Sequence, residues 1–270
     1  MAIVVGQRAE LADAPRRRAG RAWLGGLVPW AVPALLLILW QVAIQAGLLP
    51  QRILPAPLDV LRTTARMLLS EGLLADIGVS ARRALGGLLL GGGIGFALGL
   101  ANGMFPLSER LFDTTVQMLR TIPNLALLPL VILWFGIGEG ARLTLISLGV
   151  FFPVYLNTYH GVRTADPGLK EMGAVYGLSA WGQFRHIVLP GALPSILIGL
   201  RFALGVMWLT LIVAESLASN QGIGHITMDA REFMQTDVLV MGIVIYALLG
   251  KLADSLARLL ERRLLRWRPS

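Results

Sequence analysis

The chain has 270 residues, 55% of them hydrophobic and 15% charged, and its mean hydropathy of +0.67 excludes an ordinary soluble domain. Its net charge of +8 would suit a nucleic-acid-binding protein, but the arginines gather just before and just after apolar runs, as they do in membrane proteins. Cysteine is absent, which excludes disulfides, thiolate metal sites and cysteine nucleophiles. Composition therefore predicts an all-α integral membrane protein that binds no nucleic acid.

Six apolar segments are predicted to cross the membrane. A helix needs about 20 apolar residues to span a bilayer. Uncharged runs occur at residues 22–51, 84–108, 121–138 and 143–162, and two further runs at residues 186–214 and 238–256 contain very few charges. Arginines precede the first run and follow the last one, and positive residues concentrate on the cytoplasmic side. We therefore expect both termini in the cytoplasm.

No linker divides the chain, so we expect residues 1–22 to form a basic cytoplasmic tail and residues 23–270 to form one transmembrane domain. Residues 59–80 place apolar side chains among charged ones at helical spacing, which predicts a pair of surface helices on the external side. Arg82 and Arg83 follow on that side, against the charge rule. We interpret them as snorkelling residues at the membrane interface.

The second apolar run has a glycine at every fourth position, so these glycines share one face of a helix. They are Gly87, Gly91, Gly95, Gly99 and Gly103. Small residues allow membrane helices to approach closely, which predicts a helix-packing seam. The local glycine cluster does not indicate a nucleotide-binding loop, because it follows no predicted strand and lies in the middle of a span.

The third apolar run contains Pro123 and Pro129, each of which lacks a backbone donor. Membranes tolerate such breaks where protein or a water-filled cavity surrounds the freed carbonyl groups. The run either lines a pathway or is a kinked structural helix. Arg120 and Asn124, at its start, are candidates for the inner end of a pathway, although Arg120 could equally anchor at the lipid headgroups.

Three polar or aromatic side chains of the fifth run are further pathway candidates, because charges within spans usually face a cavity or a partner. Arg201 could pack in a helix interface or attract an anion. Trp208 could pack or contact substrate. Glu215 could form an ion pair at the helix end or line the pathway.

A polar segment of helical character lies between the fourth and fifth runs, on the predicted cytoplasmic side. Asp166 can cap a helix with Pro167 in its first turn, and Gly177 can end it in a left-handed conformation. Ser179 can then start a second short helix, which we expect Pro190 to end. An ordered surface segment of this kind suggests a docking site for a soluble partner.

This segment resembles the EAA loop of permease subunits of ATP-driven ABC importers, whose pattern is Glu-Ala-Ala, three residues, Gly, nine residues, Ile, one residue, Leu-Pro. The chain matches the glutamate, the glycine and the final residues, while Met172 and Gly173 replace the two alanines. The resemblance implies a coupling helix that rests on the ATPase subunit. The residues that it implies for coupling are Glu171, Gly173, Gly177, Leu178, Ser179, Ile187, Leu189 and Pro190.

Catalytic and cofactor motifs are missing from the sequence. The Gly250-Lys251 pair lacks the upstream glycine of a P-loop and is followed by leucine. The three histidines are far apart in sequence and predict no metal site. We therefore expect no enzyme, no cofactor and no metal in this chain.

Segments elsewhere in the chain resemble the nitrate/sulfonate/taurine branch of these permeases, and the aliphatic sulfonate permeases most. They lie at residues 119–123, 128–136, 157–161, 201–215, 230–233 and 246–251. The resemblance implies the type I importer permease fold with a family core at about residues 80–262. It also implies a homodimer in the lipid of a bacterial inner membrane, two cytoplasmic ATPase subunits that bind ATP and Mg, and an external substrate-binding protein.

Other functions remain open beside import of aliphatic sulfonates. The same role for taurine, nitrate or bicarbonate fits the shared core of the branch. A stand-alone secondary transporter would be expected to show repeated halves or several intramembrane ion-pair residues, and a membrane enzyme would need catalytic groups.

Overall fold

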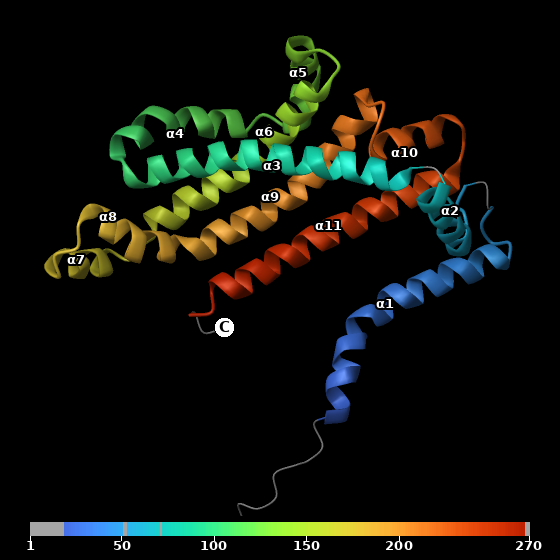
Figure 1. The fold of residues 1–270 in the computed structure, drawn as a ribbon, viewed down its shortest axis with the longest axis horizontal. Helices are drawn as coiled ribbons and strands as arrows, with labels where there is room; N and C mark the ends of the chain where they lie inside the picture. The colour runs from blue at the N-terminus through green and yellow to red at the C-terminus, as the bar shows by residue number, and fades with distance from the viewer. Residues whose placement is uncertain (1–18, 51–52, 71, 268–270) are drawn as a thin grey trace, which may run out of the picture. The chain divides into compact units, whose positions relative to one another are not determined.

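The computed structural model describes residues 19–50, 53–70 and 72–267, and every regular element in these ranges is a helix. The all-α prediction is therefore confirmed. The elements are α1 (Ala19–Gln45), α2 (Pro57–Ser70), α3 (Leu73–Met104), α4 (Pro106–Arg120), η1 (Asn124–Leu127), α5 (Leu128–Phe135), α6 (Glu139–Arg163), α7 (Pro167–Val175), α8 (Ala180–Gln183), η2 (Phe184–Val188), α9 (Leu189–Ala218), α10 (Ile223–Glu232) and α11 (Thr236–Leu264) (Figure 1). Of these, η1 is a 3₁₀ helix and η2 is a π-helix.

The chain divides into two compact units, Met1–Val60 and Leu61–Ser270. The first unit holds α1, which covers most of the first predicted span. The basic tail expected at residues 1–22 falls mostly on residues 1–18, which lie outside the described residues. Its boundary with a transmembrane domain stays a prediction.

Four helical stretches of the described chain are long and apolar enough to cross a membrane: Leu73–Met104, Glu139–Arg163, Ala180–Ser216 and Thr236–Leu264. They match the second, fourth, fifth and sixth predicted segments. The third segment is not a straight helix, because α4 and the η1–α5 stretch meet at 88°. At 1.5 Å per residue α5 alone extends only about 12 Å. Within the described residues the candidate spans number four, or five if the bent pair is one span, and six stays a prediction.

Helix α6 packs against both α3 and α9, and α9 also contacts α11 (Figure 1). The predicted glycine face of α3 lies against α6. A Cβ atom added at Gly91, Gly95 or Gly99 would lie 2.1, 2.6 or 2.7 Å from a carbonyl oxygen of α6. At Gly87 and Gly103 it would meet the side chains of Ile146 and Val162 at 2.3 and 2.7 Å. The two helices can approach this closely only because no side chain stands between them.

The structure corrects the prediction for residues 59–80. Only α2 is a separate short helix, and residues 73–80 are the first turns of the long helix α3. Arg82 is exposed, but Arg83 is 3% exposed and does not snorkel. The physical reason is that Arg83 has carboxylate partners within the protein, Glu139 and Glu215.

Candidate functional site

The segment between α6 and α9 begins with the caps that its sequence predicts. The side chain of Asp166 accepts a hydrogen bond from the backbone N–H of Gly168 at 2.8 Å, and Pro167 is in the first turn of α7. Gly177 has φ of 77°, which glycine adopts without the steric conflict of a Cβ. Ser179 Oγ accepts from the backbone N–H of Gly182 at 3.2 Å and starts α8.

The segment folds back on itself around Gly173, which is buried. A Cβ atom there would lie 2.7 Å from Ile187 Cδ1 and 3.3 Å from Leu178 Cδ1. The backbone N–H of Leu178 also donates to the carbonyl of Gly173 at 2.9 Å. Glycine at this position therefore lets α7 pack directly against η2.

The prediction that Pro190 ends the second short helix is wrong. The chain remains helical from α8 through η2 into α9, and Leu189 and Pro190 form the first turn of α9. A proline within a helix removes one backbone hydrogen bond, and the π-helix η2 lies directly before this position. The segment is thus joined to the long helix α9 without an intervening loop.

Large apolar side chains point outward from this segment, which lies at one end of α6 and α9 (Figure 1). Val175 is 86% exposed, Tyr176 80% and Trp181 67%, and Glu171 is exposed beside them. We call these four residues the exposed patch. Large exposed apolar side chains on one short polar segment are typical of a protein-binding surface.

The structure does not bring the five pathway candidates together. Arg120 is exposed at the end of α4. Arg201 forms ion pairs with Asp254 at 3.3 Å and Glu261 at 3.4 Å, both on α11, and its side chain is 37% exposed. These pairs tie α9 to α11.

Asn124 and Trp208 lie in packed surroundings. The Asn124 amide donates to the carbonyl of Leu145 and to the Thr210 hydroxyl, each at 3.3 Å, and so connects η1 to α6 and α9. Trp208 packs edge-on against Tyr246 with ring centroids 6.5 Å apart.

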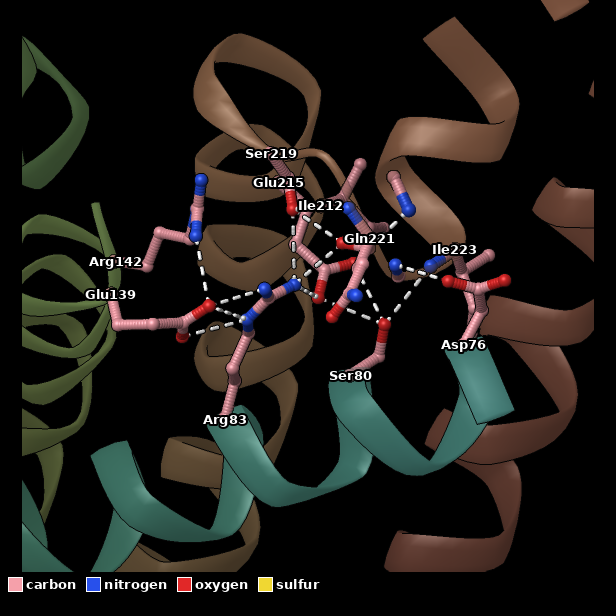
Figure 2. Close-up of polar contacts among 12 residues, drawn as sticks. Asp76, Ser80, Arg83, Glu139, Arg142, Ile212, Glu215, Ser219, Gln221 and Ile223 are labelled. Carbon is pink, nitrogen blue, oxygen red and sulfur yellow. Dashed lines mark hydrogen bonds and ion pairs between the residues drawn. The ribbon is translucent and has the colours of Figure 1, made fainter. Parts of the chain in front are cut away.

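Glu215 is fully buried at the centre of a network that Figure 2 shows. Its carboxylate accepts hydrogen bonds from Ser80 Oγ at 2.8 Å, Arg83 Nη1 at 2.8 Å, the backbone N–H of Gly224 at 3.0 Å and Tyr246 Oη at 2.9 Å. A buried carboxylate is stable only when charges and donors compensate it in this way.

Arg83 connects this carboxylate to α6. In Figure 2 its guanidinium lies between Glu215 of α9 and Glu139 of α6, and Nε donates to Glu139 Oε2 at 2.9 Å. Nη1 also donates to the carbonyl of Gln221 at 2.7 Å, in the turn before α10. Arg142, on the same helix as Glu139, forms an ion pair with it, with Nη1 2.9 Å from Glu139 Oε1. The network therefore holds together the ends of α3, α6 and α9 that lie far from the exposed patch.

Sequence reasoning missed Ser80, Arg83 and Glu139 as members of this network. A signal was present, since a charge at a membrane span needs a partner, and Arg83 and Glu215 carry opposite charges at the external ends of two predicted spans. Within the described ranges, no group of three or more His, Cys, Asp or Glu side chains could hold a metal ion.

Residues 91–266 match the family model described as the binding-protein-dependent transport system inner membrane component. The chain is 53% identical over 250 residues to the aliphatic sulfonates transport permease protein SsuC of Escherichia coli strain K12, covering 93% of this chain and 95% of the relative. It is 44% identical to the protein of the same name from Bacillus subtilis strain 168, covering 96% and 94%. The taurine transport system permease protein TauC of Escherichia coli strain K12 is 34% identical and covers 87% of each chain.

Solved structures share the fold. A bacterial ABC transporter involved in the import of alginate matches with a TM-score of 0.61 at 18% identity, covering 90% of this chain and 99% of that one. The MetNI methionine ABC transporter in an inward-facing conformation matches with a TM-score of 0.51 at 19% identity, covering 71% and 95%. The importer-permease fold predicted from the sequence is confirmed.

The chain belongs to the family of inner-membrane components of binding-protein-dependent transport systems. It is a multi-pass membrane transport component of the ABC class and not an enzyme. The family resemblance found in the sequence is thereby confirmed.

Proposed function

We propose that this chain is the permease subunit of an ATP-driven importer and forms the translocation pathway for aliphatic sulfonates. The names of the relatives at 53% and 44% identity support the substrate class. The single structural observation that supports coupling to a separate motor is the exposed patch on a segment joined helically to α9. Import of taurine is the second candidate, because a taurine permease is 34% identical.

The working complex contains two copies of this chain, two cytoplasmic ATPase subunits and an external substrate-binding protein. ATP and Mg bind to the ATPase subunits, and membrane lipid surrounds the permease. Both termini lie in the cytoplasm, and α1 and the bent α4–α5 pair complete six spans. The chain ends rich in arginine support this orientation.

In this mechanism the residues of the segment act as a mechanical link. The exposed patch binds the ATPase, so closure of the ATPase pair displaces α7. Gly173 packs α7 onto Ile187 of η2, and the continuous helix from η2 through Pro190 passes the displacement to α9. Rotation of α9 with its neighbours then exposes the pathway to one side of the membrane and afterwards to the other.

Replacing Gly177 by valine is expected to leave the fold intact and to uncouple sulfonate uptake from ATP hydrolysis. The φ of 77° is unfavourable for a β-branched residue, while a Cβ atom at Gly177 meets nothing within 4 Å. The turn should therefore change its backbone, at about 1–2 kcal/mol, rather than clash with a neighbour. Uptake per ATP hydrolysed, measured in proteoliposomes with the ATPase and the binding protein, should fall at least tenfold.

The matched control is Gly177→Asn, because asparagine tolerates the left-handed conformation much better than valine. It should retain most of the coupling. Undiminished uptake by the valine variant would contradict the coupling role proposed for the Gly177 turn. An equal loss of coupling in the valine and asparagine variants would contradict it too.

The substrate class is tested by competition. Uptake of a radiolabelled short alkanesulfonate by the complete complex should be inhibited by unlabelled alkanesulfonates and less by taurine or nitrate. A taurine preference would support the second candidate. Sulfonate transport by the purified permease without any ATPase would contradict the proposed function.

A further inference from the structure

Helix α4 attaches to the bundle by its polar face, and its apolar face is exposed. Leu107 is 69% exposed, Leu111 61% and Met118 65%. Glu109 and Asp113, one turn apart on the other face, both accept hydrogen bonds from α6. Directed polar contacts therefore join α4 to α6.

The donors on α6 form a matching row. Tyr155 Oη donates to Asp113 at 2.9 Å, and Tyr159 Oη donates to Glu109 Oε1 at 2.5 Å. Arg163 Nη1 donates to the other oxygen, Glu109 Oε2, at 2.7 Å. Because these donors are spaced four residues apart, they occupy one face of α6.

The side chains of this row also contact one another, which restricts their movement. The rings of Tyr155 and Tyr159 stack with centroids 6.1 Å apart at an interplanar angle of 6°. The guanidinium of Arg163 lies 6.0 Å from the centroid of the Tyr159 ring. Glu109 is the only carboxylate of α4 that receives two of these donors in the described structure, so it carries the strongest link of the row.

Arg163 is the last residue of α6, immediately before the segment that carries the exposed patch. The junction of α6, η2 and α9 is packed, since Val162, Ala165, Val188 and Ala192 form one buried cluster there. Helix α7 lies against η2, where a Cβ atom at Gly173 would be 2.7 Å from Ile187 Cδ1. A displacement of α7 therefore acts on the end of α6 that holds Glu109.

The far end of α4 leads into the 88° bend and η1. Asn124 of η1 is bonded to the backbone of α6 and to Thr210 of α9. Helix α4 thus connects the ATPase-facing end of the bundle with the bent segment, which its prolines identify as a candidate lining of the pathway.

We propose that Glu109 is a positioning residue that carries the movement of the ATPase-binding segment to α4 through its paired contacts with Tyr159 and Arg163. This inference rests on the proposed function, because it assumes that the segment before α9 is moved by an ATPase. It adds a second route of transmission, to α4, beside the direct route into α9. Through α4 the displacement reaches the bent α4–α5 pair.

The test is a charge exchange in the complete complex, reconstituted with its ATPase and binding protein and supplied with a radiolabelled alkanesulfonate. Glu109→Arg and Arg163→Glu should each lower uptake per ATP hydrolysed at least tenfold, while ATPase activity stays within about twofold of the original. The double variant should recover at least half of the original ratio. Asp229→Asn, which changes a half-exposed contact with His225 in α10, is the control and should leave the ratio unchanged.

Tyr159→Phe tests the same inference if a charge variant fails to fold, because it removes the hydrogen bond to Glu109 and keeps the stacked ring. It should lower the coupling ratio a few-fold without changing ATPase activity, while the melting temperature falls by no more than about 4 °C. Parallel losses of uptake and ATPase activity, or no recovery in the double variant, would overturn the inference. If Gly177→Val uncouples the complex and the Glu109 variants do not, only this inference fails. If neither does, the coupling role proposed for the Gly177 turn fails as well, whereas sulfonate transport without any ATPase would contradict the proposed function itself.

Discussion

Replacing Gly91 by alanine is expected to force α3 away from α6 and to lower the free energy of unfolding by about 3 kcal/mol, the upper part of the range for overpacked cores. The new Cβ would lie 2.1 Å from the carbonyl oxygen of Ser147 and 2.6 Å from its Cα. Backbone atoms of a packed helix cannot turn aside as the end of a flexible side chain can. In lipid, no hydrophobic drive between helices offsets the lost contact. Thermal unfolding in detergent should show a clearly lower melting temperature and a poor yield of monodisperse protein.

The matched control is Gly93→Ala, two residues away on the same helix. A Cβ atom at Gly93 meets nothing within 4 Å, and Gly93 is exposed. Alanine favours a helix over glycine by about 1 kcal/mol, so this variant should be as stable as the original protein or slightly more stable. Equal melting temperatures for the two variants would contradict the close approach of α3 and α6.

Replacing Glu215 by glutamine is expected to destabilise the protein by about 3–5 kcal/mol, because it leaves the buried guanidinium of Arg83 without its deepest partner. The carboxylate accepts from Ser80, Arg83, Gly224 and Tyr246. A glutamine amide has one acceptor oxygen, and its NH₂ group would face donors. The melting temperature in detergent and the accessibility of the α9–α10 turn to protease report the loss.

Glu232→Gln serves as the control for this change. Glu232 is an exposed carboxylate of α10, where removal of a charge should alter the free energy of unfolding by no more than about 0.5 kcal/mol. A Glu215→Gln protein as stable as this control would show that the network in Figure 2 contributes little to the fold.

The sequence predicted those features correctly that depend on residues within a single helix. Apolar length predicted α3, α6, α9 and α11, because the thickness of a membrane fixes how long an apolar helix must be. Capping residues predicted the start of α7 and α8, because Asp166 and Ser179 bond to backbone groups within a few residues of themselves. The spacing of the EAA-like segment and the strings around it predicted the family.

Predictions failed where the outcome depended on a second element. Arg83 was interpreted as an interfacial residue because it lies just before the second apolar run, on the predicted external side, yet its partners lie 56 and 132 residues away in sequence. Pro190 was expected to end a helix, but the π-helix η2 before it continues directly into the first turn of α9.

The sequence by itself determined that this protein is a helical membrane permease with a capped segment before its fifth apolar run. These properties follow from composition, periodicity and bonds between near neighbours, all of which are local. Only the tertiary structure decided which charges are paired, that Glu109 joins α4 to the end of α6, and that Glu215 is buried. Long-range pairing depends on how three helices approach one another, and that approach is set jointly by their packed faces rather than by any one stretch of chain.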